Sequence, residues 1–212
     1  MGKIIVLIGA PGAGKGTQAR LLEERRNIPQ ISTGDMFRAL KNLDSPFALQ
    51  IKAIMSAGKL VPDELTYEMV KDRTARENGS YILDGYPRTA VQAKQLEELA
   101  KEQDREIQAI EVDLPKDELM KRLTGRRSCP VCGEIYNIYS KPPKHDNVCD
   151  LHPDVPLTHR ADDNEESVAT RLAVYDEQTK PLLDYYRNTG RLQKVSGAGD
   201  LEDIYREIDK LI

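Results

Sequence analysis

The chain contains 212 residues with no Trp, two Phe and nine Tyr, and its formal net charge at pH 7 is −4. This length fits one large domain or a core with insertions, and the core is expected to be mainly aliphatic. The acidic balance argues against non-specific nucleic-acid binding, and no apolar stretch approaches the roughly 20 residues of a membrane span. We therefore expect neither nucleic acid nor a membrane among the partners, and a cytoplasmic location.

The first predicted element is a short apolar strand at residues 4–8, which leads into the glycine-rich loop Gly9–Thr17 and then a helical pattern. This order is typical of a phosphate-binding P-loop, because the helix N-terminus presents free N–H groups and glycines let the backbone approach the phosphates. Lys15 is expected to reach the terminal phosphates. Gly16 stands where this pattern has Ser or Thr, and Thr17 follows, so the magnesium-binding hydroxyl is displaced by one position. The alternative is a glycine-rich turn without a ligand.

Strand and helix patterns alternate along the rest of the chain. Further strand-like runs lie at 28–31, 81–83, 107–112 and 192–195, and helical patterns lie at 15–25, 34–42, 46–57, 63–77, 89–103, 116–124, 163–188 and 200–211. The residues predicted to begin helices include Asp35, Ser45, Asp63 and Thr89. This alternation predicts an α/β fold in which helices cover both faces of a parallel sheet. Pro181 lies inside the pattern at 163–188, so this helix is predicted to kink there or to be two helices.

Candidate ligands follow the second strand, in the segment Ile31–Arg38. Ser32, Thr33 and Asp35 are placed to begin a helix and to offer polar groups to a ligand. Arg38, one turn further on, is a candidate phosphate partner because a guanidinium group can donate two parallel hydrogen bonds to phosphate. The alternative is an ordinary helix cap with an exposed arginine.

A second group of candidates follows the third strand. Asp84 ends that strand, where an acid in P-loop proteins organises magnesium and its waters. Gly85 permits a close ligand approach, Arg88 begins the next helix, and Gln92 carries both a donor and an acceptor, which suits the edge of a purine. The alternative is a strand–turn–helix connection capped by Thr89.

Five arginines lie at or just outside the two ends of residues 125–162, a proline-rich stretch that lacks helical periodicity and is predicted to be an inserted module. They are Arg122, Arg126, Arg127, Arg160 and Arg171. A solvated face would explain one or two of them, whereas five indicate a movable cover that brings positive charge onto phosphates. The neighbouring pair Asp162–Asp163 is expected to bind these arginines or to form a hinge.

The inserted module also contains a candidate metal site. The chain has three cysteines, an odd number that argues against a disulfide framework. Cys129-x2-Cys132 and Cys149-x2-His152 have the spacing of a structural zinc site, which would stabilise a module with little core of its own. One disulfide with a free thiol, or unligated cysteines, are the alternatives. Other candidates for the fourth ligand are His145, Asp150, Asp154 and His159.

Taken in order, the P-loop and the motifs STGDMFR, GKLVPDE, LDGYPRT, LTGRR, CPVC and RADDNEE resemble those of the bacterial adenylate kinases that carry a long lid, over essentially the whole chain. The resemblance implies a P-loop NTPase-type parallel sheet flanked by helices, with a helical insertion that binds the nucleoside monophosphate (NMP) and a small zinc-bearing lid. The implied boundaries are 1–31, 62–124 and 163–212 for the core, 32–61 for the NMP-binding insertion and 125–162 for the lid.

The same resemblance implies the site residues. ATP would be bound by Gly12, Ala13, Gly14, Lys15, Gly16, Thr17, Arg126, Ile135, Tyr136 and Gly199. AMP would be bound by Thr33, Arg38, Lys59, Leu60, Val61, Gly85, Tyr86, Pro87, Arg88, Gln92, Arg160 and Arg171. The catalytic side chains would be Lys15, Arg88, Arg126, Arg160 and Arg171. Zinc would be held by Cys129, Cys132, Cys149 and His152, and magnesium, through water, by Asp84.

The implied reaction is the reversible conversion of ATP and AMP into two ADP with magnesium, by a monomer. A UMP- or CMP-directed kinase is the nearest alternative, and Thr33, Gln92 and the long module favour AMP over it. A P-loop switch without phosphoryl transfer is a second alternative, but Arg38, Arg88 and Gln92 indicate a second nucleotide site. A zinc-ribbon nucleic-acid module is a third alternative, and the acidic net charge argues against it.

Overall fold

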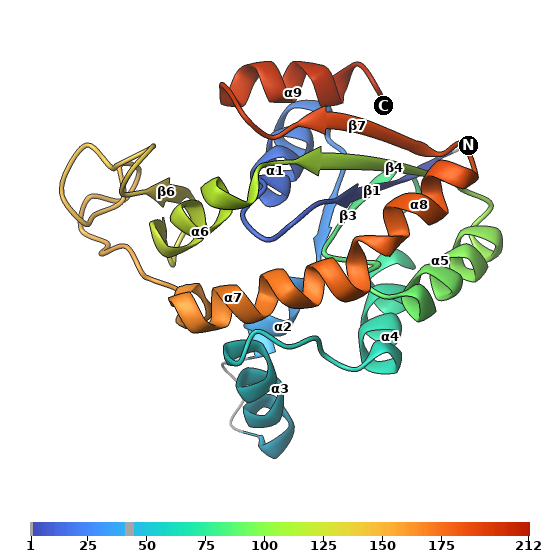
Figure 1. Ribbon diagram of the computed structural model, residues 1–212, viewed down its shortest axis with the longest axis horizontal. Helices are drawn as coiled ribbons and strands as arrows, with labels where there is room; N and C mark the ends of the chain where they lie inside the picture. Colours follow the sequence, from blue (N-terminus) through green and yellow to red (C-terminus); the bar gives the residue numbers. More distant parts are fainter. Residues whose placement is uncertain (1, 41–44) are drawn as a thin grey trace.

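The computed structural model describes residues 2–40 and 45–212. Within them, parallel strands form a five-stranded central sheet in the order β2-β3-β1-β4-β7 (Figure 1). The strands are β1 Lys3–Ile8, β2 Gln30–Ser32, β3 Tyr81–Asp84, β4 Glu106–Asp113 and β7 Leu192–Ser196. Each overlaps a run of residues predicted as a strand, and the predicted α/β fold with a parallel sheet is confirmed.

Helices cover both faces of the sheet because side chains alternate along its central strand. On one face, Ile4, Val6 and Ile8 of β1 pack in a core with α5 (Ala90–Glu102) and α8 (Pro181–Asn188). On the other face, Ile5 and Leu7 pack with α1 (Lys15–Arg26) and α9 (Leu201–Asp209). The two cores are aliphatic with a few buried tyrosines, as the composition predicted.

The carboxyl ends of three strands meet at one edge of the sheet. Leu7 of β1 lies beside Asp84 of β3, and Ser32 of β2 lies on the other side of Asp84. The glycine loop after β1 therefore lies next to the residues that follow β2 and β3. This is the edge at which ligands bind in open α/β sheets.

The segment between β2 and β3 is helical. Its helices are α2 Thr33–Ala39, α3 Pro46–Ser56 and α4 Asp63–Thr74. The side chain of Ser32, rather than Asp35, caps α2 by accepting a hydrogen bond from the backbone N–H of Asp35, and Ser45 caps α3. The last two positions of the helix predicted at 34–42 lie outside the described residues.

The inserted stretch 125–162 follows α6 (Lys116–Thr124) and contains two short antiparallel strands, β5 Arg126–Ser128 and β6 Ile135–Asn137. The sequence did not reveal these strands because three residues are too few for a periodic pattern. Cys129, Tyr136, Cys149 and Leu157 form a small core of the module, which lies at one end of the molecule in Figure 1, drawn in yellow.

The helical pattern predicted at 163–188 is divided, as Pro181 required. After a 3₁₀ turn at Ala161–Asp163, α7 spans Glu165–Val174 and a π-helical turn spans Tyr175–Thr179 before α8 begins at Pro181. The backbone N–H of Lys180 bonds to the carbonyl of Tyr175, five residues back. This wider turn precedes a proline, which has no N–H to continue the ordinary ladder. No helix among the described residues combines the length and apolar character needed to cross a membrane.

Candidate active site

The loop after β1 has the conformation expected of a phosphate-binding loop. Gly12 and Gly14 adopt positive φ angles of 89° and 99°, which favour glycine. Gly14 is the N-cap of α1, so the free N–H groups of that helix face the loop. A Cβ atom on Gly16 would lie 3.1 Å from Asp84 Oδ2, so this glycine lets the carboxylate approach the loop where the general motif has Ser or Thr.

Lys15 folds back over this loop. Its ammonium group donates hydrogen bonds to the carbonyls of Gly9, at 2.7 Å, and Ala10, at 3.0 Å. Burial lowers the pKa of Lys15 to about 8, with Arg88 and Arg171 lowering it further and the negative charge of Asp84 opposing the shift. A lysine whose charge is disfavoured in this way gains most from an anionic ligand.

Acidic side chains hold two of the predicted arginines in place. The guanidinium group of Arg126 donates to both oxygens of Asp163, at 2.8 and 2.5 Å, and Arg171 contacts Asp163 at 3.0 Å and Asp162 at 3.1 Å. The side chain of Asp163 is fully buried. The predicted pairing of Asp162–Asp163 with these arginines is therefore observed.

The other arginines around the insertion divide into two groups. Burial lowers the pKa of Arg160 to about 10, and repulsion from Arg126 and Arg38 contributes, so Arg160 belongs to the same positive cluster. Arg122 instead bonds to the carbonyl of Gly197, and Arg127 bonds to main-chain carbonyls of its own segment. Arg127 therefore serves local structure at the base of the insertion, whereas Arg122 joins α6 to the segment before α9.

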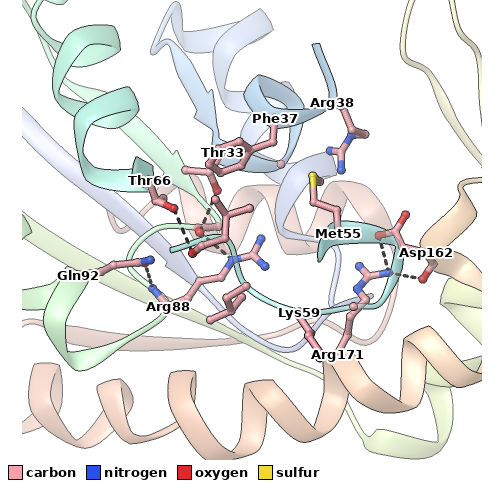
Figure 2. Close-up of a pocket in the computed structure, with 15 residues that line it drawn as sticks. Thr33, Phe37, Arg38, Met55, Lys59, Thr66, Arg88, Gln92, Asp162 and Arg171 are labelled. Atoms are coloured by element: carbon pink, nitrogen blue, oxygen red, sulfur yellow. Dashed lines mark hydrogen bonds and ion pairs between the residues drawn. The ribbon is translucent and has the colours of Figure 1, made fainter. Parts of the chain in front are cut away.

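A cavity opens between α2, α3 and the turn after β3. It comprises about 580 Å³ of free space, including the part open to solvent. Figure 2 shows the guanidinium groups of Arg38, Arg88 and Arg171 approaching this cavity from three different elements. The residues of the predicted monophosphate site that line it are Thr33, Arg38, Lys59, Leu60, Val61, Gly85, Arg88, Gln92 and Arg171. The structure thus brings together residues that the sequence separates by more than a hundred positions.

Hydrogen bonds order one wall of this cavity. The carbonyl of Gly85 accepts hydrogen bonds from the hydroxyl of Thr33, at 3.0 Å, and from Nε of Arg88, at 2.8 Å. The backbone N–H of Arg88 donates to Oε1 of Gln92 at 2.7 Å. Tyr86 is buried beneath this wall, and its hydroxyl donates to the carbonyl of Gln92. The side chain of Thr33 and the amide oxygen of Gln92 are therefore each held by a hydrogen bond to a neutral backbone group.

Sequence reasoning missed other residues that line the cavity. They are Gly34, Phe37, Met55, Gly58, Thr66 and Asp162. Gly58 could have been recognised from the sequence as the end of a helix, because a glycine just after a helix commonly adopts a positive φ angle. Its φ angle is 73°. A Cβ atom on Gly58 would lie 2.7 Å from the carbonyl of Ser167, so the glycine lets the end of α3 approach α7. The apolar residues had no distinguishing pattern, because Phe37 and Met55 also pack among the helices of this segment.

The residues predicted for the ATP side outside the loop lie in two places, the inserted module and the turn before α9. Ile135 lines a second, smaller hollow together with Thr17 and the start of α9. Gly199 lies in the turn before α9 with a φ of 114°. The side chain of Tyr136 points into the small core of the module, where its hydroxyl accepts a hydrogen bond from the N–H of Asp150 at 2.9 Å. The side chain of Tyr136 therefore serves the module itself and lines neither of the two hollows.

The four predicted zinc ligands form one cluster. The ligand atoms of Cys129, Cys132, Cys149 and His152 all lie within 4.8 Å of one another. Cys149 Sγ is 3.7 Å from both Cys132 Sγ and His152 Nδ1, and a tetrahedron of sulfurs at about 2.3 Å from zinc has edges of roughly 3.8 Å. All three cysteines are free thiols, so the disulfide alternative is not formed. Among the candidates for the fourth ligand, the structure brings His152 to the cysteines, and the cluster fits a metal ion.

The model of the family described as "Adenylate kinase" matches residues 7–191 of the chain. The chain belongs to the adenylate kinase family. It is 46% identical over 211 residues to the adenylate kinase of Bacillus subtilis (strain 168), which covers 98% of this chain and 97% of the relative. It is 46% identical over 207 residues to that of Thermodesulfovibrio yellowstonii, with 96% of each chain covered. For the adenylate kinase of Nitrosococcus oceani the identity is 45% over 210 residues, covering 98% of this chain and 97% of the relative.

These comparisons confirm the resemblance inferred from the motifs and the P-loop NTPase-type fold. They support adenylate kinase function over the UMP- or CMP-directed alternative. The cavity also argues against a P-loop switch with a single nucleotide, because Arg38, Arg88 and Arg171 line it in addition to the loop that carries Lys15.

Proposed function

We propose that this chain catalyses the reversible transfer of the γ-phosphoryl group from magnesium-bound ATP to AMP, giving two ADP. The observation that carries this proposal is the convergence of positive groups between the P-loop and the cavity. Lys15, Arg88 and Arg171 lie close enough for each arginine to lower the pKa of the lysine, and two of the three also line the cavity.

ATP is proposed to bind with its phosphates in the loop Gly12–Thr17, where Gly12, Gly14 and Gly16 offer backbone N–H groups and Lys15 reaches the terminal phosphates. The N–H of Ala13 bonds to the carbonyl of Ala10 and holds the loop in shape. Arg126 would contact these phosphates from the inserted module. Ile135, the main chain of Tyr136 and Gly199 would surround the base and ribose.

AMP is proposed to occupy the cavity. Its phosphate would be bound by Arg38, Arg88, Arg160 and Arg171, since guanidinium groups donate paired hydrogen bonds to phosphate. Its base would lie against Thr33, the Lys59–Val61 backbone, the turn Gly85–Pro87 and Gln92. This arrangement would place the AMP phosphate between the cavity and the loop, facing the γ-phosphoryl group of ATP.

The chemistry then requires little from the protein beyond position and charge. The AMP phosphate is ionised at neutral pH, so its oxygen can attack the γ-phosphorus directly while the bond from that phosphorus to the β-phosphate bridging oxygen breaks. Lys15, Arg88, Arg126, Arg160 and Arg171 would stabilise the charge on the transferring group. Covering this group with residues 125–162 would exclude water and suppress ATP hydrolysis.

Two metal ions are part of the proposal. Magnesium bound to ATP would neutralise charge on the β- and γ-phosphates; the Thr17 hydroxyl and, through water, Asp84 would hold it beside the loop. Zinc would be held by Cys129, Cys132, Cys149 and His152. Its proposed role is structural, because the inserted module has a small core and metal binding can supply its folding energy.

The family resemblance also supports three further proposals. The first is that the protein acts as a monomer on ATP, AMP and ADP, and the second is that it is cytoplasmic. The third concerns the domain boundaries: the core comprises 1–31, 62–124 and 163–212, the NMP-binding insertion 32–61, and the lid 125–162.

The test is ADP formation from ATP and AMP with magnesium, beside UMP, CMP and GMP as acceptors and ATP alone as the control. We expect rapid ADP formation with AMP and slow formation with the other acceptors. Preferential use of another monophosphate would contradict the proposed base contacts. An absence of transfer to every acceptor would contradict the proposed reaction.

A further inference from the structure

The side-chain amide of Gln92 is held at both ends. Gln92 is buried, with 2% of its surface exposed, and lines the proposed monophosphate cavity. Its oxygen, Oε1, accepts a hydrogen bond from the backbone N–H of Arg88 at 2.7 Å, and its nitrogen, Nε2, donates to Oδ1 of Asp63 at 2.8 Å. The contact with Arg88 is drawn in Figure 2. Both ends of this amide therefore have a protein partner before any ligand binds.

The two partners permit one orientation of the amide. A backbone N–H can only donate, and an ionised carboxylate can only accept. Rotating the amide by 180° would set the Gln92 NH₂ group against the Arg88 N–H, and Oε1 against the Asp63 carboxylate. Both contacts would then be repulsive. The order of donor and acceptor that Gln92 shows to the cavity is therefore determined by its surroundings.

Asp63 is itself fixed. It is the first residue of α4, and the same oxygen that binds Gln92 also accepts a hydrogen bond from the hydroxyl of Thr89 at 3.1 Å. The Thr89 hydroxyl in turn accepts from the backbone N–H of Gln92 as the cap of α5. These contacts join the starts of two helices. Asp63 is not among the residues that line the cavity, so it acts on a ligand through Gln92.

We propose that Asp63 is a positioning residue that sets the preference for 6-amino over 6-oxo purine monophosphates by fixing the amide of Gln92. The proposal rests on the proposed function, in which Gln92 meets the base of AMP. After its bonds to Arg88 and Asp63, the amide keeps one acceptor position on Oε1 and one hydrogen on Nε2.

This remaining pair matches one kind of purine. Adenine presents a donor, its 6-amino group, beside an acceptor, N1. Hypoxanthine and guanine present the reverse, an acceptor at O6 beside a donor at N1. A fixed amide can form both hydrogen bonds with the edge of adenine. Against hypoxanthine or guanine, the same amide would place its acceptor against an acceptor and its donor against a donor. A site whose buried polar groups are left unpaired by the wrong substrate rejects that substrate strongly.

The test compares AMP with IMP, which differs at the 6 position. Asp63→Ala and Asp63→Leu both remove the acceptor, and one retains side-chain bulk. Because leaving a buried donor unpaired is costly, we expect kcat/KM for AMP to fall about tenfold in each. We expect the ratio of kcat/KM for AMP to that for IMP to fall at least about threefold, with the KM for ATP within about twofold of wild type. Asp63→Asn, which keeps a carbonyl acceptor, should lie between wild type and Asp63→Ala.

Glu64→Ala is the matched control. Glu64 is exposed, lies in the same first turn of α4 and accepts a hydrogen bond from Nε2 of Gln95, so this change removes the same charge near the helix start. We expect its AMP-to-IMP ratio to equal that of wild type. A proportional fall for AMP and IMP in the Asp63 variants would show a merely structural role and overturn the proposal, as would unchanged kinetics or an Asp63→Asn ratio at or below that of Asp63→Ala.

Two further measurements separate this proposal from the proposed function. A wild-type enzyme that does not phosphorylate AMP would contradict the reaction itself. Unchanged kcat/KM for AMP in Gln92→Ala would contradict the base contact, whatever the Asp63 variants show. A loss in Gln92→Ala with no loss in Asp63→Ala would overturn the positioning role alone.

Discussion

The base end and the phosphate end of the cavity are organised differently. At the base end, Thr33 and Gln92 are fixed by hydrogen bonds to neutral backbone groups and to Asp63. At the phosphate end, positive side chains are paired with carboxylates: Arg38 with Asp35, and Arg171 with Asp162 and Asp163. The first arrangement can receive a base without rearranging, whereas at the second a phosphate must compete with carboxylates for the same donors.

The difference has a physical reason. A neutral amide can be bonded to the protein and still keep donor and acceptor positions for a base. Burying a guanidinium group is less unfavourable when a carboxylate lies beside it. Arg38 and Arg171 have such partners, whereas Arg88 is bonded to the carbonyl of Gly85. We therefore expect selectivity for the base to be set more rigidly than affinity for phosphate.

The largest effect is expected at the phosphate end, from Lys15→Met. This change removes the charge nearest the loop, and we expect turnover to fall by about 10³-fold or more while the melting temperature stays within a few degrees. Coupled ADP assays and thermal melting check both. The control is Lys116→Met, which removes an exposed lysine paired with Asp176. Wild-type turnover in the Lys15 variant would contradict its proposed role.

A smaller effect is expected from Arg88→Ala, which touches both ends of the cavity. The guanidinium group is lost while the backbone N–H that binds Gln92 remains. We expect kcat/KM for AMP to fall about 10²-fold and the KM for ATP to change by less than about threefold, because the lost group is proposed to bind the phosphate of AMP. Arg76→Ala, at an exposed arginine that pairs with Asp72, is the control. Equal losses for the two substrates would argue against a position on the AMP side.

Asp163→Asn removes a buried partner shared by Arg126 and Arg171. Because breaking a buried ion pair costs several kcal/mol, the melting temperature should fall by roughly 10 °C, and turnover should fall about tenfold as both arginines lose their positions. Thermal melting and steady-state kinetics at low temperature measure these effects. An unchanged melting temperature would contradict the idea that this carboxylate holds the cluster together.

A pH profile examines Lys15 without a mutation. Its pKa of about 8 in the folded protein lies below the usual 10.5, so kcat/KM for ATP should fall as pH rises above about 8, by about tenfold per unit at most. Between about 8 and 10.5 the unfolded chain holds this proton and the folded protein does not, so stability contributed by Lys15 rises with pH. A Lys15→Arg enzyme that shows the same fall in kcat/KM would assign the titration to another group.

The smallest effect on the chemistry is expected from removing the metal of the inserted module. Treating the protein with a chelator should release about one zinc ion per chain and lower the melting temperature, because the small core of the module relies on the cluster. Turnover at low temperature should change by less than about twofold, since no ligand of this cluster contacts a substrate in the proposed mechanism. Metal analysis, thermal melting and kinetics together check this. If metal analysis of gently purified protein finds no zinc, the assignment of the cluster as a zinc site is contradicted.

Much of the molecule was predictable from local pattern. Short continuous apolar runs predicted the strands of the sheet, because a parallel strand buried on both faces is apolar on both faces. The glycine loop with Lys15 predicted the phosphate site. The spacing of Cys129, Cys132, Cys149 and His152 predicted a cluster that the structure brings together. Each of these signals lies within a short segment or a pair of segments, where the chemistry demands particular residue types.

Other features depend on contacts between distant segments, and only the tertiary structure decided them. Of five arginines with the same local appearance, Arg127 binds backbone carbonyls of its own segment, Arg122 binds the carbonyl of Gly197, 75 positions away, and Arg126 and Arg171 share Asp163. Asp63 looked like an ordinary acid at a helix start until the fold placed it against Gln92, 29 positions away. The sequence by itself determined which groups were available to bind phosphate, metal and base. The packing of helices from separate segments decided which groups share a partner and which way each one faces, because those contacts have no local pattern.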